Sequence, residues 1–572
     1  MKLAIFFVFA IALTTIAEKQ LCYGTNREVK KKYDFVVVGS GPGGIIAFEL
    51  ASAGYSVLLL ERGGNTSNSL PLILQQGDVR NPGFNPEIIR PHYSLEDKVR
   101  GTRGIYFPTA FGAGGGSKIA YGRQHVFGDA RIYDEFWGAE WNYASMLPYF
   151  IKTENFTRED GNIVDTTAHG INGKVYTFLE NTFNVSQWSV PTQALINTFS
   201  LDGIGDDPNN LPNGPENKIY PGVRSFGHDP TNYTPQDIWD KIIFPAIPTL
   251  HKLCVALNST VLRLVTSLDN ECDNIPSNDP EIHGVKYMFR DKLTVVCHRN
   301  KTILAAGPIF TPAILQRSGI GNADHLTNVG IPILYHNPNV GQNLLNQYLI
   351  RFSYTANSSS CRPPGRGIIM YLCSQSSYDT ACNFTNTILT IRGDQETGNP
   401  GTISLFDSTS AIYPNIKKGS VNIISSDLLR DPIVSFSITP NGVNGPELQP
   451  YVYLISHLLD LTSNFPLDSN CIWTRTNPPL STLPDNASES QIRSFVFSVT
   501  NGFLGSGWHF GGTAKLGDVD DSTAVVDRKC NVIGVKNLVI GDLSVIPALP
   551  NAHTNSIAEA IGYKVADIIL YG

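Results

Sequence analysis

The 572-residue sequence has little charge, with 16% Asp, Glu, Lys and Arg and a net charge of −7. This balance offers no electrostatic case for binding nucleic acid or an anionic membrane. After the first residues, no apolar run is long enough to span a bilayer. We find no metal-ligand spacing among Cys and His, no internal repeat, no coiled coil and no low-complexity tract. What remains is a globular protein, too long for one ordinary core, with about two interleaved domains.

The first 22 residues have the pattern of a secretory signal peptide. Lys2 precedes an apolar core from Leu3 to Leu13 and then small residues, with cleavage expected after Ala17 or nearer Cys22. Nine Asn-x-Ser/Thr sequons also favour secretion, and they predict a glycoprotein. The candidate sites are Asn65, Asn155, Asn184, Asn232, Asn258, Asn300, Asn357, Asn383 and Asn486.

Nine cysteines are present, and some of them should pair in an oxidising compartment. Cys361, Cys373 and Cys382 lie in one loop-like region, where a local disulfide is plausible. The pairing as a whole does not follow from the sequence, and neither does the oligomeric state.

The stretch from Tyr33 to Gly44 predicts a dinucleotide-binding unit. An apolar run reads as a buried parallel strand, and it breaks into a G-x-G-x-x-G loop followed by a helical pattern. Gly39 would permit the tight turn, Gly41 the close approach of a pyrophosphate, and Gly44 the packing of helix on strand. A second strand, Ser56 to Leu60, ends on Glu61, which can accept hydrogen bonds from a ribose.

Further elements are expected along the chain. Residues 133–150 favour a helix, residues 253–264 a strand pair, residues 284–297 a hairpin and residues 301–306 a buried strand. Residues 419–425 predict a strand and residues 450–462 a helix. A second glycine-rich run, from Phe111 to Ala120, indicates backbone packed against something flat or charged.

The most specific stretch is Gly307 to Gly321, which resembles the second signature of the glucose–methanol–choline (GMC) oxidoreductase family. Residues 111–120 resemble that family's first signature, and Val340 to Leu344 its V-G-x-N-L turn. Trp508 to Gly517 resembles its catalytic motif, and Val539 to Pro547 its V-V-D-x-S-x-x-P strand. The resemblance runs from about Tyr33 to the C-terminus.

The resemblance implies an α/β fold: a Rossmann-type FAD-binding domain with an interleaved substrate domain built on an antiparallel sheet flanked by helices. The FAD-binding domain would take residues 33–155, 226–345 and 501–572. Residues 156–225 form a substrate-domain or loop excursion, and residues 346–500 form the substrate domain.

The resemblance also implies bound FAD. Its adenosine end would lie on Gly39, Gly41, Gly44 and Glu61, and its isoalloxazine under the Gly115-Gly116-Ser117 loop. Further cofactor contacts are expected from Val261, Ala306, Trp508, Asp542, Thr554 and Asn555. Ile119 stands where some members carry a flavin-linking His, so the FAD should be non-covalent.

Two histidines occupy the family's paired catalytic positions, His509 after Trp508 and His553 in Pro550 to Asn555. Alcohol oxidation needs loss of the hydroxyl proton with hydride transfer to the flavin, and a neutral imidazole suits the proton step. We expect His509 to be the principal base and His553 to hydrogen-bond the substrate oxygen. A His/His pair is similar to that of aryl-alcohol oxidases and hydroxynitrile lyases.

Two departures from the family pattern stand out. Ala120 replaces the Asn that usually ends the first signature, which leaves one polar contact near the flavin unaccounted for. Asn346-Gln347 replaces the usual Asp-His after the V-G-x-N-L turn. This second change should alter local hydrogen bonding without removing a catalytic group.

The sequence therefore predicts a secreted FAD-dependent oxidase of a small aromatic alcohol or a mandelonitrile-like cyanohydrin, with O₂ reduced to H₂O₂. The partners are this substrate and O₂, with no nucleic acid, membrane or metal. A hydroxynitrile lyase and a quinone-linked alcohol dehydrogenase stay open as alternatives. A non-enzymatic flavoprotein is disfavoured by the intact histidine pair, and an NAD-dependent enzyme by the two flavin signatures.

Overall fold

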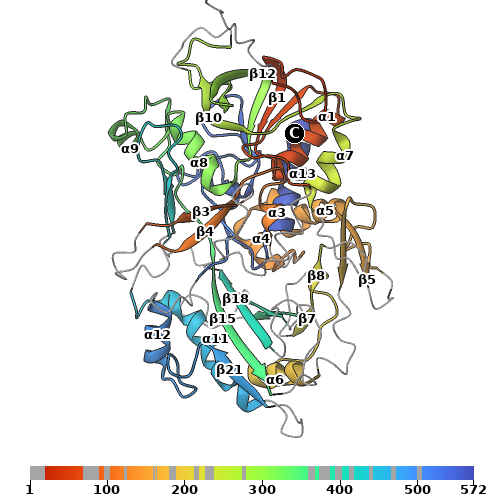
Figure 1. Cartoon of the computed structure of the whole chain (residues 1–572), viewed down its shortest axis with the longest axis vertical. Helices are drawn as coiled ribbons and strands as arrows, with labels where there is room; N and C mark the ends of the chain where they lie inside the picture. The colour runs from red at the N-terminus through yellow and green to blue at the C-terminus, as the bar shows by residue number, and fades with distance from the viewer. Residues whose placement is uncertain are drawn as a thin grey trace, which may run out of the picture.

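The computed structural model describes most of the chain. The described residues are 20–67, 89–95, 104–120, 125–158, 162, 164–179, 189–211, 218–225, 237–272, 279–357, 368–372, 387–392, 402–410, 418–436, 442–464, 472–498 and 505–572. They form a mixed α/β protein with two large sheets, one in the upper half of Figure 1 and one in the lower half. The α/β fold class is confirmed.

The upper sheet has the hydrogen-bonded order β10-β11-β12-β1-β2-β9, with β23 also paired to β12. β23, β12, β1, β2 and β9 pair in parallel, whereas β10, β11 and the start of β12 are antiparallel. The bounds are β1 Lys32–Val38, β2 Val57–Leu60, β9 Leu253–Ala256, β10 Ser259–Thr266, β11 Ile282–Phe289, β12 Lys292–Leu304 and β23 Leu538–Ile540.

These bounds confirm the predicted strands at 35–38, 56–60 and 301–306 and the hairpin at 284–297. The predicted strand pair at 253–264 is wrong in its pairing. β9 and β10 are both strands, but they lie at opposite ends of the sheet order, because β9 pairs with β2 and β10 with β11.

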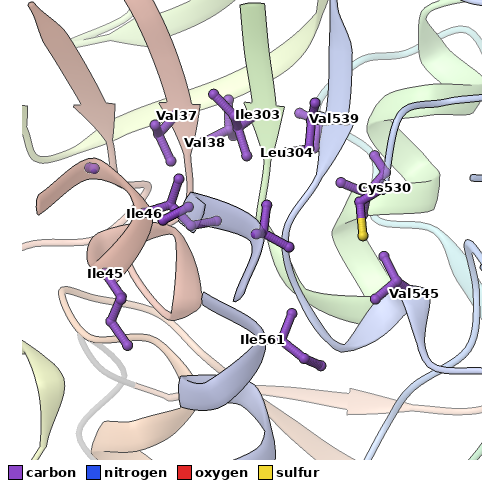
Figure 2. Packing of buried hydrophobic residues seen from close by; sticks show 14 of the residues in the cluster. Val37, Val38, Ile45, Ile46, Ile303, Leu304, Cys530, Val539, Val545 and Ile561 are labelled. Atoms are coloured by element: carbon purple, nitrogen blue, oxygen red, sulfur yellow. The ribbon is translucent and has the colours of Figure 1, made fainter. Parts of the chain in front are cut away.

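Helices α1 (Pro42–Ser52) and α13 (Asn555–Tyr571) pack together beside this sheet (Figure 1). Figure 2 shows side chains from three neighbouring strands, among them Val37, Ile303 and Val539, in one cluster with Ile46 and Ile561. At the helix crossing, a Cβ on Gly562 would lie 2.9 Å from the carbonyl oxygen of Pro42, so only glycine allows this approach. The start of α1 is therefore anchored from the C-terminal end of the chain.

The lower sheet has the order β21-β15-β18-β17-β16-β7 and is antiparallel, and β22 also pairs with β15. Helices α6, α11 and α12 contribute to its core. The bounds are β7 Ile219–Pro221, β15 Gln347–Ala356, β16 Ile368–Leu372, β17 Thr387–Arg392, β18 Thr402–Ser410, β21 Trp473–Asn477, β22 Gly505–Ser506, α6 Ser189–Phe199, α11 Gln449–Asp460 and α12 Glu489–Phe497. β7 comes from the predicted 156–225 excursion, and β22 comes from beyond residue 500.

Shorter elements complete the fold. The predicted helix at 133–150 is two helices, α4 and α5, separated by Gly138 and a 3₁₀ turn. The predicted strand at 419–425 and helix at 450–462 are confirmed as β19 and α11. The remaining bounds are β3 Ile89–Tyr93, β4 Tyr106–Ala110, β5 Glu154–Arg158, β6 Val175–Leu179, β8 Val223–Arg224, β13 Ile320–Gly321, β14 Tyr335–His336, β19 Ser420–Asn422, β20 Ile433–Ser435, α3 Gly116–Ile119, α4 Ala130–Phe136, α5 Tyr143–Thr153, the π-helix η2 Trp239–Ile243, α7 Phe244–Ala246, α8 Gly307–Arg317 and α9 Ala323–Asn328.

Two disulfides join Cys22 to Cys254 and Cys272 to Cys297, and Cys530 is a buried free thiol. The predicted local bridge among Cys361, Cys373 and Cys382 lies outside the described residues. Within the described ranges, no helix combines the length and apolar character that crossing a bilayer requires.

Candidate active site

The turn between β1 and α1 has the geometry of a phosphate-binding loop. Gly39 has φ +95°, and a Cβ there would lie 2.3 Å from the carbonyl oxygen of Ala305, so glycine is required. A Cβ on Gly41 would meet no atom within 4 Å, which leaves open space on that side of the loop. The loop opens α1, whose N-terminal amides favour an anion. The predicted roles of Gly39 and Gly41 therefore fit the structure.

The role predicted for Gly44, allowing the helix to pack on the strand, is filled by Gly43 in the structure. A Cβ on Gly43 would lie 3.0 Å from Val37 Cγ1 of β1 and 2.8 Å from Ala305 Cβ, so Gly43 allows the helix to approach the strand. A Cβ on Gly44 would instead lie 3.1 Å from Cγ1 of Ile243, in the π-helix η2. The motif's spacing identified the loop, but the direction of each Cα–Cβ bond decides which glycine meets which neighbour.

Glu61 ends β2 beside the same loop, as predicted. Its Oε2 accepts hydrogen bonds from the Ser40 amide at 3.0 Å and the Ser40 hydroxyl at 2.5 Å, and its Oε1 accepts from the Gly63 amide at 2.9 Å. Burial raises the pKa of this carboxyl, although the hydrogen bonds oppose the rise. Since a carboxylate has about four acceptor positions, one remains for a ribose hydroxyl.

The second glycine-rich loop lies directly against the first. The Gly114 amide donates to the Ser40 hydroxyl at 2.9 Å, and a Cβ on Gly115 would be 3.2 Å from Gly41 Cα. Gly116 opens α3 and, like Gly41, has open space where its Cβ would be. Ser117 does not point outward, because its hydroxyl donates to the Gly114 carbonyl at 2.7 Å. Two loops more than 70 residues apart thus form one glycine-lined cradle.

Lys118, for which the sequence gave no signal, anchors this cradle to η2. Its buried ammonium lies 2.9 Å from an Asp237 carboxylate oxygen and 2.6 Å from one of Asp240. The same π-helical segment supplies Ile243 against Gly44. Short π-helical segments often occur at functional sites, and this one supports both glycine-rich loops.

Asp542 and Ala306 meet at the start of α8. Asp542 Oδ2 accepts from the Gly307 amide at 2.9 Å and from the Thr311 hydroxyl at 2.6 Å. Burial raises the pKa of Asp542. Ala306 precedes this helix as its N-cap, and Ala305 contacts Gly39. These residues therefore hold the ends of the parallel strands around the cradle.

The other predicted cofactor residues lie in three places. Val261 is buried in β10. Thr554 is the N-cap of α13, and Asn555 donates to Glu559 Oε1 at 2.8 Å. Trp508 is partly buried in a left-handed conformation, with φ +62°, directly before His509. Among the described residues, no three His, Cys, Asp or Glu side chains converge as a metal site would require.

The two candidate catalytic histidines lie together, although 44 positions separate them in the chain. The ring centroids of His509 and His553 are 5.2 Å apart, with the planes at 76°. Both side chains are partly exposed, as a base that must reach a substrate should be. The surrounding protein lowers the pKa of His509 to about 4, because burial disfavours its charged form. His509 is therefore neutral at ordinary pH and can accept a proton.

Gln347 is the site residue whose role the sequence did not reveal. Its Oε1 lies 2.5 Å from His509 Nδ1, and its Nε2 donates to the carbonyls of Pro550 and Ala552, each at 3.1 Å. The departure from Asp-His at 346–347 pointed to changed hydrogen bonding. The contact with the candidate catalytic histidine, His509, required the fold, since 162 positions in the chain separate the partners.

An aromatic cluster includes the residues that follow His509 and Gln347 in the chain. Phe510 lies 5.4 Å from Phe107 and 5.8 Å from Phe436 between ring centroids, and Phe436 lies 6.2 Å from Tyr348. Phe510 and Tyr348 directly follow His509 and Gln347 in the chain. Phe107 and Phe510 belong to a buried apolar cluster, and Phe436 and Trp508, the residue before His509, pack against it.

Comparisons with known proteins agree with this geometry. Two family models described as GMC oxidoreductase match residues 247–349 and 416–562. The chain is 26% identical to a 5-(hydroxymethyl)furfural oxidase of Methylovorus sp. (strain MP688), covering 94% of this chain and 98% of that protein. It is 24% identical to an oxygen-dependent choline dehydrogenase of Vibrio vulnificus (strain YJ016), covering 95% of each.

Solved structures share the fold. A formate oxidase crystal structure superposes with a TM-score of 0.76 at 18% identity, covering 94% of this chain and 98% of the other. A fungal aryl-alcohol oxidase superposes with a TM-score of 0.72 at 19% identity, covering 95% and 99%.

Proposed function

Because the chain belongs to the GMC oxidoreductase family, we propose that it is a flavin-dependent oxidase of a small aromatic alcohol or cyanohydrin. The single observation that carries the proposal is the contact between His509 and His553, with His509 held neutral. A neutral imidazole close to a second histidine is suited to take a hydroxyl proton while its neighbour orients the oxygen.

FAD fits the cradle that the two glycine-rich loops form. Gly41 and Gly116 leave open space for a ligand, the start of α1 suits its pyrophosphate, and Glu61 keeps one acceptor position for its ribose. FAD, when bound there, supplies the hydride acceptor for the oxidation. We further propose that it is held without a covalent bond, since Ile119 offers no nucleophile. Acid precipitation should then release the yellow colour into the supernatant, and a coloured pellet would contradict it.

The protein's own residues handle the proton. His509 takes the hydroxyl proton of the substrate, and His553 hydrogen-bonds the same oxygen and holds it in place. The lowered pKa of His509 matters here, since a protonated imidazole could not act as the base.

The aromatic cluster beside the pair supports an aromatic substrate. Phe510 follows His509 in the chain and packs with Phe107 and Phe436, and apolar rings near the pair would favour a ring over a charged or strongly hydrated group. Two of the similar proteins, the 5-(hydroxymethyl)furfural oxidase and the aryl-alcohol oxidase, carry names that point to alcohols on aromatic rings. A mandelonitrile-like cyanohydrin is the finer proposal within this class.

The decisive experiment gives the purified holoenzyme benzylic alcohols and mandelonitrile, first without oxygen and then with it. An oxidase must lose its visible flavin absorbance anaerobically and form stoichiometric peroxide when oxygen returns. Benzaldehyde and cyanide formed from mandelonitrile while the flavin spectrum stays oxidised would establish a lyase. Loss of absorbance that recovers only with an added quinone would establish a dehydrogenase.

We also propose that the protein is secreted and glycosylated. The two disulfides support an oxidising compartment. Among the described sequons, Asn65, Asn258, Asn300, Asn357 and Asn486 are exposed. Glycosidase treatment of protein secreted from a eukaryotic host should lower its apparent mass, and an unchanged mass would contradict this proposal.

A further inference from the structure

Gln347 joins the two catalytic loops through both ends of its side-chain amide. It opens β15 and is fully buried. The nitrogen end donates to the carbonyls of Pro550 and Ala552, just before His553, and the oxygen end meets His509 Nδ1 at 2.5 Å. One side chain thus links the His509 loop to the loop that carries His553.

The chemistry of these partners allows only one arrangement of hydrogens. Two backbone carbonyls can only accept, so the NH₂ group of Gln347 must face them, and its oxygen must face the imidazole. The reverse orientation would place the amide oxygen against two buried carbonyl oxygens, although the Pro550 carbonyl would still accept from the Ala552 amide at 2.8 Å. Because the Gln347 oxygen can only accept, His509 Nδ1 must carry the hydrogen of the neutral ring.

We infer that Gln347 is a positioning residue that sets the tautomer of His509, so that Nε2 keeps its lone pair and is the atom that takes the substrate proton. The transfer of a substrate proton to Nε2 rests on the proposed function. The tautomer of His509 does not. Gln347 also fixes the position of His509 relative to His553, since the same amide hydrogen-bonds to both loops.

Three variants separate this role from simple packing. Gln347→Met fills similar space but releases the imidazole. Gln347→Glu keeps an acceptor beside Nδ1 and adds negative charge. The matched control is Gln316→Met, because Gln316 is a second buried glutamine whose Nε2 donates to the carbonyls of Val340 and Val421, at 3.2 and 3.0 Å, without touching a histidine.

The first readout needs no turnover. In holoenzyme carrying ¹⁵N-labelled histidine, the His509 signal, assigned by its loss in His509→Asn, should show a protonated Nδ1 and an unprotonated Nε2. Gln316→Met should keep this pattern, and Gln347→Met should replace it with a mixture of tautomers. A wild-type signal with the hydrogen on Nε2, or an unchanged signal in Gln347→Met, overturns the inference.

The second readout is the rate of anaerobic flavin reduction against pH. Gln347→Met should slow flavin reduction about tenfold or more. This effect is smaller than the roughly 10²- to 10⁴-fold loss expected when the general base itself is removed. Gln347→Glu should move the acid limb to higher pH, because a carboxylate favours the charged imidazole. If Gln347→Met and Gln316→Met slow reduction equally, with the same pH profile as the wild type, the role is packing alone and the inference fails.

The two proposals fail in different ways. If no alcohol reduces the flavin but the Nδ1–H tautomer is present and depends on Gln347, the oxidase proposal falls and the tautomer assignment stands. Rapid reduction with the opposite tautomer would leave the oxidase proposal standing and overturn the role of Gln347.

Discussion

The site around His509 and the cluster around His169 hold the same side chain in two different charge states, neutral at His509 and positive at His169. His169 is buried between two carboxylates, with Nδ1 2.9 Å from Glu154 Oε2 and Nε2 2.9 Å from Asp207 Oδ2. These partners raise its pKa to about 10 despite desolvation. His509 has a neutral amide on Nδ1, and desolvation lowers its pKa to about 4. Burial removes the charge from an imidazole unless carboxylates restore it.

The difference separates a structural cation from the proposed catalytic base. His169⁺ ties β5 to the segment around Asp207 and stacks on Phe156 with ring centroids 3.6 Å apart, so both ring nitrogens and one face are occupied. His509 has only Nδ1 engaged by Gln347. A histidine held by two carboxylates could not accept a substrate proton at neutral pH.

The largest expected effect is at His509. His509→Ala should slow anaerobic flavin reduction by about 10²- to 10⁴-fold, the worth of a positioned general base. Stopped-flow absorbance measures this rate. The matched control is His298→Gln, because desolvation lowers the pKa of His298 to about 4 as it does that of His509, but His298 lies in β12. The control should retain the wild-type rate, and bleaching that survives in His509→Ala would assign the base elsewhere.

The opposite pattern is expected at His169. His169→Gln should cost about 3–5 kcal/mol of stability, because it leaves Glu154 and Asp207 buried without a cation. Thermal unfolding of the holoenzyme measures this loss against His251→Gln, an exposed control. Holoenzyme that remains folded should reduce its flavin at a near wild-type rate. An unchanged Tm in His169→Gln would contradict the claim that a charged His169 stabilises the fold through Glu154 and Asp207.

Removing both carboxylates should erase the difference between the two histidines. In Glu154→Gln/Asp207→Asn, His169 has only neutral partners, so its pKa should fall below 6.5 as that of His509 does. The destabilisation should be smaller than in His169→Gln, since no buried charge is left unpaired. An NMR titration of labelled histidine follows the pKa, and a value still above neutrality would show that another charge holds it up.

Taken per pH unit, the smallest effect is the change in stability with pH, and the two histidines give it opposite signs. The contribution of His169 is fully present below pH 6.5 and is lost as pH rises toward about 10, by at most about 1.4 kcal/mol per pH unit. His509 lowers the stability of the folded protein as pH falls from 6.5 toward about 4, because the unfolded chain then binds a proton that the native site excludes. Tm measured across pH should therefore fall on the alkaline side in the wild type and fall less there in His169→Gln. Equal alkaline slopes would contradict the assignment.

Sequence reasoning succeeded where the signal lies within a few neighbouring residues. The strand–loop–helix at 33–52, Glu61 at the end of β2 and the two histidine motifs were placed correctly because each depends on local pattern. It failed where the outcome depends on distant partners. β9 and β10 adjoin in the chain but pair at opposite ends of the sheet, and no local signal decides between those pairings.

The roles of some residues, inside the candidate site and outside it, could not be predicted from the sequence for the same reason. Lys118 is one charged residue among many until η2 brings Asp237 and Asp240 against it. His169 had no assigned role, because its two carboxylates come from separate segments of the chain. The replacement of Asp-His by Asn346-Gln347 indicated altered hydrogen bonding. It could not show that the side-chain amide of Gln347 contacts His509.

The sequence by itself determined the family, the α/β class, the two glycine-rich loops and the presence of two candidate catalytic histidines. These follow from residue type and short spacing, because a turn needs its glycine and a base needs its imidazole wherever the fold carries them. Only the tertiary structure decided which histidine is charged and which is neutral. A pKa depends on burial and on charges within a few ångströms, and residues far apart in the chain supply both.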